Sequence, residues 1–195
     1  SALRFEIMRT DSLGVRQGGT TGQKIDLPEL PLRRADGSPN DALVAAHAAL
    51  HGRTVNIVDA YAQEGFDFSG TRAFDQRTGY RSQSFLTVPM TDHQGELIGV
   101  LQLLNALDPA TGKVVAFSNA DQSLTESLAS QAAIALSNRL LITQLERLFE
   151  SFVKLINIAI DEKSPYTGGH CERVPELTMM LAEAADATTT GPLAD

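Results

Sequence analysis

The sequence lacks several features that would place a protein of 195 residues in a class at once. It has a single cysteine, Cys171, which excludes an internal disulfide framework and favours a reducing compartment, so a cytoplasmic location is expected. The net charge is −8 and no stripe of lysine and arginine is present, which argues against nucleic acid as a partner. The longest apolar runs, near residues 97–101, are too short to cross a membrane, and no secretory leader pattern occurs.

What the chain does have is enough apolar residues, 43%, to bury a core. Residues 1–120 have a mixed α/β pattern. Leu3, Phe5 and Ile7 alternate with polar residues from the start, which predicts one half-buried strand and a chain that begins inside a domain whose first elements are missing. Asn40 is a suitable N-cap for a helix over 41–51, and a strand is predicted over 54–58.

The strongest sheet signal is a hairpin with arms at 84–90 and 96–104 and a turn at 91–95. Both faces of the second arm are apolar. One face carries Leu97, Leu101 and Leu103, and the other carries Ile98, Val100 and Leu104. A strand of this kind needs cover on both sides, which predicts a sheet between two layers that can enclose a pocket.

Residues 120–163 form one helical pattern without glycine or proline, and about 44 residues of helix would extend ~66 Å. Its apolar residues follow a heptad repeat. The helix can pack on its own sheet, as its first half is expected to do, or pair with a second chain. We expect the second half to form a parallel homodimer through a seam of Leu128, Ala135, Ile142, Leu145, Phe149, Phe152 and Ile156.

Ser164-Pro165 is predicted to stop this helix, and Thr167 to cap an amphipathic helix over 168–185. The apolar face of that last helix has nothing after it to cover it. We therefore expect residues 164–195 to be the beginning of a further domain.

The segment 59–82 has no convincing helical or strand period, and loops of this length are usually functional or disordered. Aromatic residues alternate in it with charged ones. Such a pattern suits a lid over a small planar ligand, but equally a small core that pins a long loop. The candidate ligand-binding residues are Asn56, Asp59, Tyr61, Phe66, Phe74, Asp75, Thr78 and Tyr80.

The histidines give a weaker signal. His47 and His51 lie four residues apart, a spacing that can hold a metal, but local sequence places no third ligand beside them. The pair is therefore interpreted as ordinary surface or packing histidines, although a haem or other redox cofactor on His47 or His93 remains a further hypothesis. No set of nucleophile, base and orienting group can be assembled, so the chain itself is not expected to be an enzyme.

Three phrases, NIVDAY, FDQRTGYRSQSFLTVPM and IGVLQLLN, resemble a GAF domain of the cyclic-nucleotide phosphodiesterase and adenylyl-cyclase type. The resemblance implies an α+β fold with an antiparallel sheet of about six strands, a ligand pocket roofed by residues 57–74, and a long signalling helix that joins two protomers. The family's cyclic-nucleotide motif corresponds here to Asn105-Ala106, Phe117 and Asp121-Gln122. Its lysine is absent, so the Lys–Asp ion pair of that motif cannot form.

The phrase IDEKSPYTGGHCERVPELTMMLAEAA is similar to the opening of an HD-GYP domain, a bacterial metal-dependent phosphodiesterase of cyclic di-GMP. By this resemblance His170 would be one ligand of a two-metal site holding iron or manganese in a parent enzyme. The other ligands are absent, so no metal and no cofactor are expected in this chain.

These observations predict a GAF sensor at 1–120, a signalling helix at 121–163 and the start of an HD-GYP domain at 164–195. The predicted function is a regulatory module that binds an unknown small molecule, a cyclic nucleotide among the candidates, dimerises, and controls the attached phosphodiesterase. The alternative is a dimerisation scaffold without a ligand.

Overall fold

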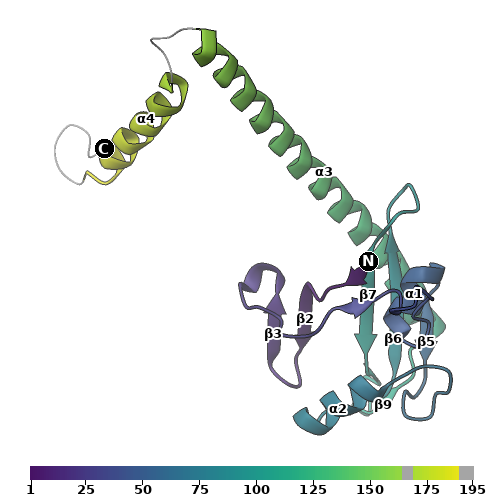
Figure 1. Ribbon diagram of the computed structural model, residues 1–195. Helices are drawn as coiled ribbons and strands as arrows, with labels where there is room; N and C mark the ends of the chain where they lie inside the picture. Colours follow the sequence, from purple (N-terminus) through teal and green to yellow (C-terminus); the bar gives the residue numbers. More distant parts are fainter. Residues whose placement is uncertain (164–168, 189–195) are drawn as a thin grey trace. The chain divides into compact units, whose positions relative to one another are not determined.

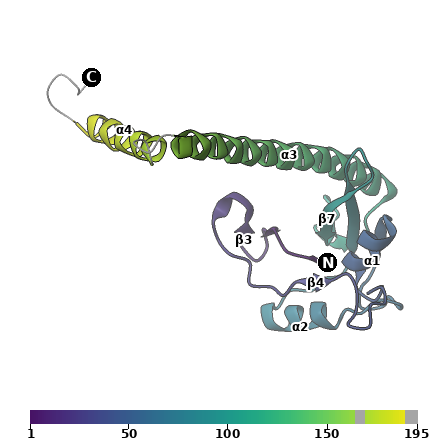
Figure 2. The same ribbon diagram turned by 45° about the horizontal axis from the view of Figure 1, so that its top comes forward.

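The computed structural model describes residues 1–163 and 169–188 (Figure 1). The chain divides into two compact units, residues 1–138 and 139–195. The long helix α3 (Asn119–Lys163) contributes its first part to one unit and the rest to the other, and Figure 2 shows it unbroken. No helix in the described ranges is long and apolar enough to cross a membrane.

The described strands form antiparallel sheets. The largest has the order β5-β6-β7 and consists of β5 (Val55–Ile57), β6 (Phe85–Thr91) and β7 (Leu97–Leu104). The two-stranded pairs are β1 (Ala2–Leu3) with β4 (Leu30–Pro31), β2 (Ile7–Thr10) with β3 (Val15–Gly18), and β8 (Ala106–Leu107) with β9 (Val114–Val115). The remaining helices are η1 (Gly19–Thr21), α1 (Val44–His51), α2 (Ser69–Thr78) and α4 (His170–Asp186).

The central strand β6 divides the core into two clusters, because alternate side chains of a strand point to opposite faces. Leu86, Val88 and Met90 pack against Ala129 and Ala133 of α3. On the other face, Phe85 joins a cluster with residues of α1, β5 and the segment that leads to α2, namely Val44, Ile57, Ala60 and Phe68. Helices α1 and α3 therefore cover opposite faces of the sheet.

The α+β class, the antiparallel sheets, the long helix and the short C-terminal helix are as predicted. The hairpin, the strand over 54–58 and the helix over 120–163 are confirmed to within two residues at each end. The strands are distributed differently from the expected sheet of about six, since the largest described sheet has three. The predicted stop at Ser164-Pro165 and the cap at Thr167 lie outside the described residues.

The single strand predicted from Leu3 to Ile7 is wrong. The chain pairs first as β1 with β4 and then as β2 with β3, so the run is interrupted where it changes partner. Ile7 is 73% exposed as a result. Alternation alone cannot show such a change of partner.

The helix predicted from residue 41 begins at Val44, with Leu43 as N-cap. Asn40 does not cap it. Its backbone N–H donates to the Leu32 carbonyl and its side-chain amide donates to the Pro31 carbonyl, so Asn40 belongs to the preceding loop.

Residues 59–82, which the absence of a clear period led us to interpret as a long loop, contain the helix α2. Asp75 is the only residue of α2 that is buried, so the helix has no apolar stripe for a periodicity argument to detect. Its start is marked by the Asp67 carboxylate, which accepts from the Ser69 N–H at 2.8 Å.

Strand β7 differs from expectation in two respects. Ile98 was expected on the face opposite Leu101, but both pack against the cluster on the α3 side, because the register shifts beside Met90 and Thr91. In addition, β7 is an edge strand whose far end is not covered within the described residues, since Leu103 and Leu104 are exposed.

Candidate functional site

A buried carboxylate, Asp75, organises the segment that sequence reasoning chose as the ligand-binding region. The Tyr61 hydroxyl donates to Asp75 Oδ2 at 2.8 Å. The Ser82 N–H donates to the same oxygen and the Ser82 hydroxyl to Oδ1, each at 2.8 Å. These bonds tie α2 to the residues just before β6. Ser82 was not among the predicted residues, because nothing in the local sequence marks it.

On the exposed side of the Tyr61–Asp75 group, a cation stacks on an aromatic ring. The Arg81 guanidinium lies 4.3 Å from the centre of the Tyr61 ring, and Arg72 lies 6.0 Å from it. The hydrogen bond to Asp75 raises the pKa of Tyr61 above its usual value. The group thus offers a flat ring, a cation and a buried anion within one short segment.

The remaining predicted residues of this segment lie around α2. Asp59 accepts from the Tyr61 N–H at 2.8 Å, and Phe66 packs on the α1-side cluster. Phe74 has Arg77 5.8 Å from its ring centre, and Thr78 donates to the Phe74 carbonyl. The N–H of Tyr80 donates to the Thr78 hydroxyl at 3.4 Å.

Asn56 does not join that group. Because it alternates with buried Ile57 along β5, its side chain lies on the α3 side of the sheet. Its amide donates to the Phe117 carbonyl at 3.1 Å and to Gln122 Oε1 at 3.2 Å.

A polar cleft of about 410 Å³ lies on that same side of the sheet. It is lined by Gly52, Arg53, Thr54, Val88, Pro89, Thr91, Gln122, Glu126 and Ser130, none of which is among the eight predicted ligand-binding residues. Hydrogen bonds from Thr54 and Gln122 lower the pKa of Glu126, so its charge is stabilised there.

The positions that correspond to the cyclic-nucleotide motif serve the fold. Asn105 is the one described non-glycine residue with a positive φ, +58°. Its Oδ1 accepts from the Gln83 N–H at 2.7 Å, and its Nδ2 donates to the Arg81 carbonyl at 2.7 Å. Asp121 accepts from both the N–H and the hydroxyl of Ser118 at the start of α3.

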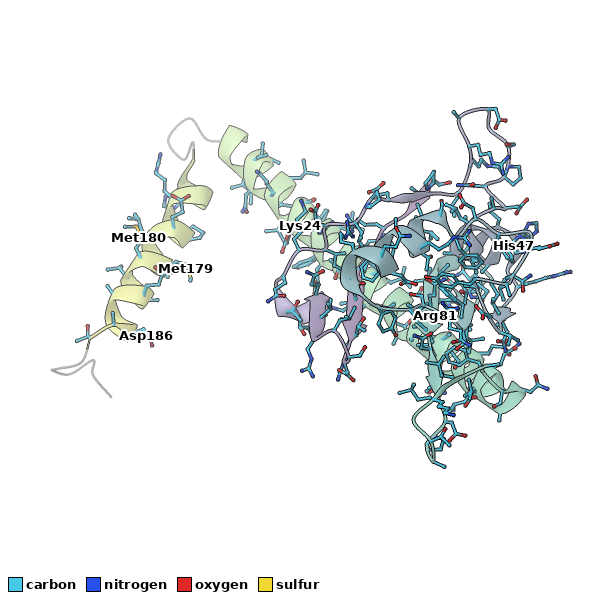
Figure 3. All side chains as sticks on the ribbon, turned by 90° about the horizontal axis from the view of Figure 1, so that it is seen from below. Lys24, His47, Arg81, Met179, Met180 and Asp186 are labelled. Carbon is cyan, nitrogen blue, oxygen red and sulfur yellow. The ribbon has the colours of Figure 1, made fainter. Side chains whose placement is uncertain are left out.

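A second polar cluster lies at α1. Asp41 Oδ1 is 2.7 Å from His51 Nε2 and 3.2 Å from His47 Nδ1. These three ligand atoms all lie within 4.8 Å of one another, and no other such group of three occurs in the part of the chain that the structure describes. Figure 3 labels His47 and Arg81 at different positions in this unit, and the cluster has no residue in common with the Tyr61–Asp75 group.

The prediction from sequence missed this cluster because it placed Asp41 in the first turn of the helix. The helix begins at Val44, so Asp41 lies in the preceding loop, where its carboxylate is close to both histidines. The other candidate histidines have different surroundings. His93 lies in the turn between β6 and β7, next to Gln94, and His170 is the exposed first residue of α4.

The predicted dimer seam is apolar and exposed in the single chain. Leu128, Ala135, Ile142, Leu145, Phe149, Phe152 and Ile156 all have exposed side chains. In the first part of α3 the opposite face is buried instead, through Ala129, Ala133 and Ser137.

Comparison with known proteins gives a consistent family. Residues 7–136 match the profile of the GAF domain. The chain is 30% identical over 118 residues to the dual 3',5'-cyclic-AMP and -GMP phosphodiesterase 11A of Takifugu rubripes, and 35% identical over 95 residues to phosphodiesterase 11 of the same description from Drosophila melanogaster. The matches cover 60% and 49% of this chain but only 12% and 6% of those relatives.

Solved structures that match part of this chain include a type II free methionine-R-sulfoxide reductase from Thermoplasma acidophilum, at 24% identity and a TM-score of 0.37, over 58% of this chain and 63% of that one. Another is the GAF domain of an Acinetobacter phosphoenolpyruvate-protein phosphotransferase, at 19% identity and a TM-score of 0.35, over 55% of this chain and 59% of that one.

Proposed function

Since this chain belongs to the GAF domain family, we propose that it is a regulatory module that senses a small molecule, dimerises through α3 and controls an attached phosphodiesterase. The proposal rests on one observation above all. Helix α3 packs small residues on the sheet along one face and exposes an apolar heptad seam along another.

A continuous series of contacts supports transmission from the candidate ligand region to α3. Asp75 fixes α2 to Ser82, three residues before β6 begins. Leu86 and Val88 of β6 in turn pack against Ala129 and Ala133. A ligand that stacks on Tyr61 in place of Arg81 would alter the first of these contacts, and the packed core would carry the change to α3.

For the ligand to act as a signal, it must bind one packing of the helix pair more tightly than another. The proposed ligand contacts are Asp59, Tyr61, Phe66, Phe74, Asp75, Thr78 and Tyr80, which all lie between β5 and β6. Asn56, the eighth predicted residue, is left out because its side chain lies on the α3 side of the sheet. A small planar molecule suits their ring and charge content.

Dimerisation is tested by a charge in the seam. Leu145 and Leu140 are 66% and 56% exposed, but only Leu145 lies on the heptad seam, whereas Leu140 lies on the opposite face. We expect Leu145→Glu to turn the dimer into monomers in light scattering, while Leu140→Glu remains dimeric. Wild-type chains that are monomeric at high micromolar concentration would overturn this part of the proposal.

Ligand binding is tested by thermal unfolding with 3',5'-cyclic AMP and GMP, the nucleotides in the names of the two phosphodiesterase relatives. A ligand at a hundredfold its Kd stabilises by about 2.7 kcal/mol, a shift that is easily measured. Mass spectrometry of the denatured protein would detect a co-purified ligand of another kind. No shift and no released molecule would favour the alternative, a dimerisation scaffold without a ligand.

The attached enzyme is proposed to be a cyclic di-GMP phosphodiesterase of the HD-GYP type, with His170 as one of its iron or manganese ligands. Its support is the phrase around His170 and the helix α4, which begins at that residue. We expect this chain by itself not to hydrolyse cyclic di-GMP with either metal. We also expect the chain to reside in the cytoplasm, as its single cysteine favours.

A further inference from the structure

The cluster at α1 has the composition of a metal site. Two imidazoles and a carboxylate converge from the loop before α1 and from two successive turns of that helix. Nitrogen and oxygen donors of this kind suit zinc and its neighbours among the divalent transition metals, whereas calcium and magnesium prefer oxygen donors alone.

The spacing of the ligand atoms fits a small ion. In a tetrahedral zinc site with bonds near 2.0–2.1 Å, neighbouring ligand atoms lie ~3.3 Å apart. Here Asp41 Oδ1 lies 3.2 Å from His47 Nδ1 and 2.7 Å from His51 Nε2. The two histidine nitrogens lie within 4.8 Å of each other, so an ion bound by all three atoms would draw the ends of the side chains together.

The state of His47 is an independent indication. Its Nδ1 is buried from solvent and makes no hydrogen bond by geometry within the described residues, and its nearest charged neighbour is Asp41 Oδ1 at 3.2 Å. A buried polar atom without a partner normally costs free energy, and a metal bond to its lone pair would satisfy it.

We propose that Asp41 Oδ1, His47 Nδ1 and His51 Nε2 bind one zinc ion. The side chains are between a third and a half exposed, which leaves a coordination position for water. The site goes beyond the sensing function proposed above and uses none of its proposed ligand residues, although one of them, Phe66, packs against His47.

The surroundings indicate what the ion does. The ring of His47 packs edge-on against Phe66, with centroids 5.4 Å apart, and Phe66 packs in the same way on Phe68 of the α1-side core cluster. The Asp67 N–H donates to the Ala42 carbonyl at 2.7 Å. Zinc therefore fastens the loop before α1 to the helix, and through Phe66 stabilises the segment between β5 and α2.

The test is a titration of the chelator-treated full chain with zinc chloride, followed by calorimetry and thermal unfolding. His170 and Cys171 are adjacent in sequence and could hold zinc adventitiously, so the chain carries His170→Ala and Cys171→Ser in all measurements. We expect saturation at one zinc per chain, and a rise in Tm of about 5–10 °C with zinc at a hundredfold its Kd.

The variants are His51→Ala and Asp41→Ala, with His93→Ala as the matched control. We expect the first two to lose most of the rise in Tm and the control to keep it. Magnesium and calcium at the same concentration should leave Tm unchanged.

Because a variant at α1 can fail to fold, NMR spectra of the histidine rings in the otherwise unaltered chain provide a second readout. Zinc should shift the ring signals of His47 and His51 and leave those of His93 in place. Zinc-dependent shifts confined to His93, or no saturable binding, would overturn the proposal and leave the cluster as a hydrogen-bonded pair.

Discussion

At the start of α3, two residues satisfy each other's hydrogen-bonding groups. The Ser118 hydroxyl accepts from the Asp121 N–H at 3.2 Å, and the Asp121 carboxylate accepts from the Ser118 N–H and hydroxyl, each at 2.8 Å. This is a capping box, and its spacing is visible in the sequence. The hydrogen bonds from Ser118 lower the pKa of Asp121.

We predict that Ser118→Ala destabilises the chain by about 1 kcal/mol in urea unfolding at neutral pH, because the first turn of α3 loses its cap. The folded pKa of Asp121 lies below its unfolded value of about 3.9, so the contribution of its charge is complete above that value and is lost as pH falls through the folded pKa. The cost of Ser118→Ala should therefore shrink in acid. Ser127→Ala, at an exposed position inside α3, is the control and should cost nothing measurable.

The Tyr61–Asp75 hydrogen bond gives a second prediction at this scale. Tyr61→Phe should cost about 1–2 kcal/mol, because it removes a donor from a carboxylate that is only 4% exposed. In a double-mutant cycle with Asp75→Ala, which removes the acceptor, the two changes should not be additive. Tyr80→Phe is the control, since the described part of the chain shows no hydrogen bond from its hydroxyl. Additive costs would mean that the hydrogen bond contributes nothing to stability.

Helix α3 combines two requirements in one element. Its small residues at Thr125, Ala129, Ala133 and Ser137 recur every four positions and let the helix approach β6 closely. Its seam recurs every seven. Under the function proposed above, these two patterns would let a change in the domain core reach the partner helix at the seam.

Exchanging alanine for leucine at either face separates these roles. Ala133→Leu should destabilise by about 1–3 kcal/mol, because Ala133 is fully buried against β6 and has no room for a larger side chain. Ala135→Leu, two residues further on the exposed seam, should leave unfolding of the monomer unchanged and strengthen dimerisation. Equal effects of the two substitutions in denaturant melts would contradict this assignment of faces.

For the whole molecule, the position of the core determines what can fold alone. Every residue of the two core clusters lies at or before Ala133. The unit of residues 1–138 therefore contains all of the described buried clusters, together with the Asp92–Ser137 contact near its end.

We predict that a chain ending at Asn138 still unfolds in one cooperative transition, because it keeps both clusters. It should be monomeric at concentrations at which the full chain dimerises, since most of the seam has been removed. Circular dichroism on heating and light scattering measure the two outcomes. A shortened chain with no thermal transition would show that residues after 138 are needed for folding.

Local repetition was sufficient to predict several features of this protein. The hairpin around residues 91–95 follows from two apolar runs on either side of a polar turn, and the uninterrupted helix of α3 follows from a heptad repeat. Both signals depend only on neighbours in the chain. The family also follows from contiguous phrases. In contrast, α2 was missed because its only buried residue is an aspartate.

The sequence alone thus determined the α+β class, the long helix and its heptad seam, because each is written in the spacing of nearby residues. Only the tertiary structure decided that Asp41 meets His47 and His51, that Tyr61 is held by Asp75, and that Asn56 turns to α3. Such contacts between side chains depend on the path of the loops that connect the elements. The path of a loop is set by contacts between residues distant in sequence rather than by any local period.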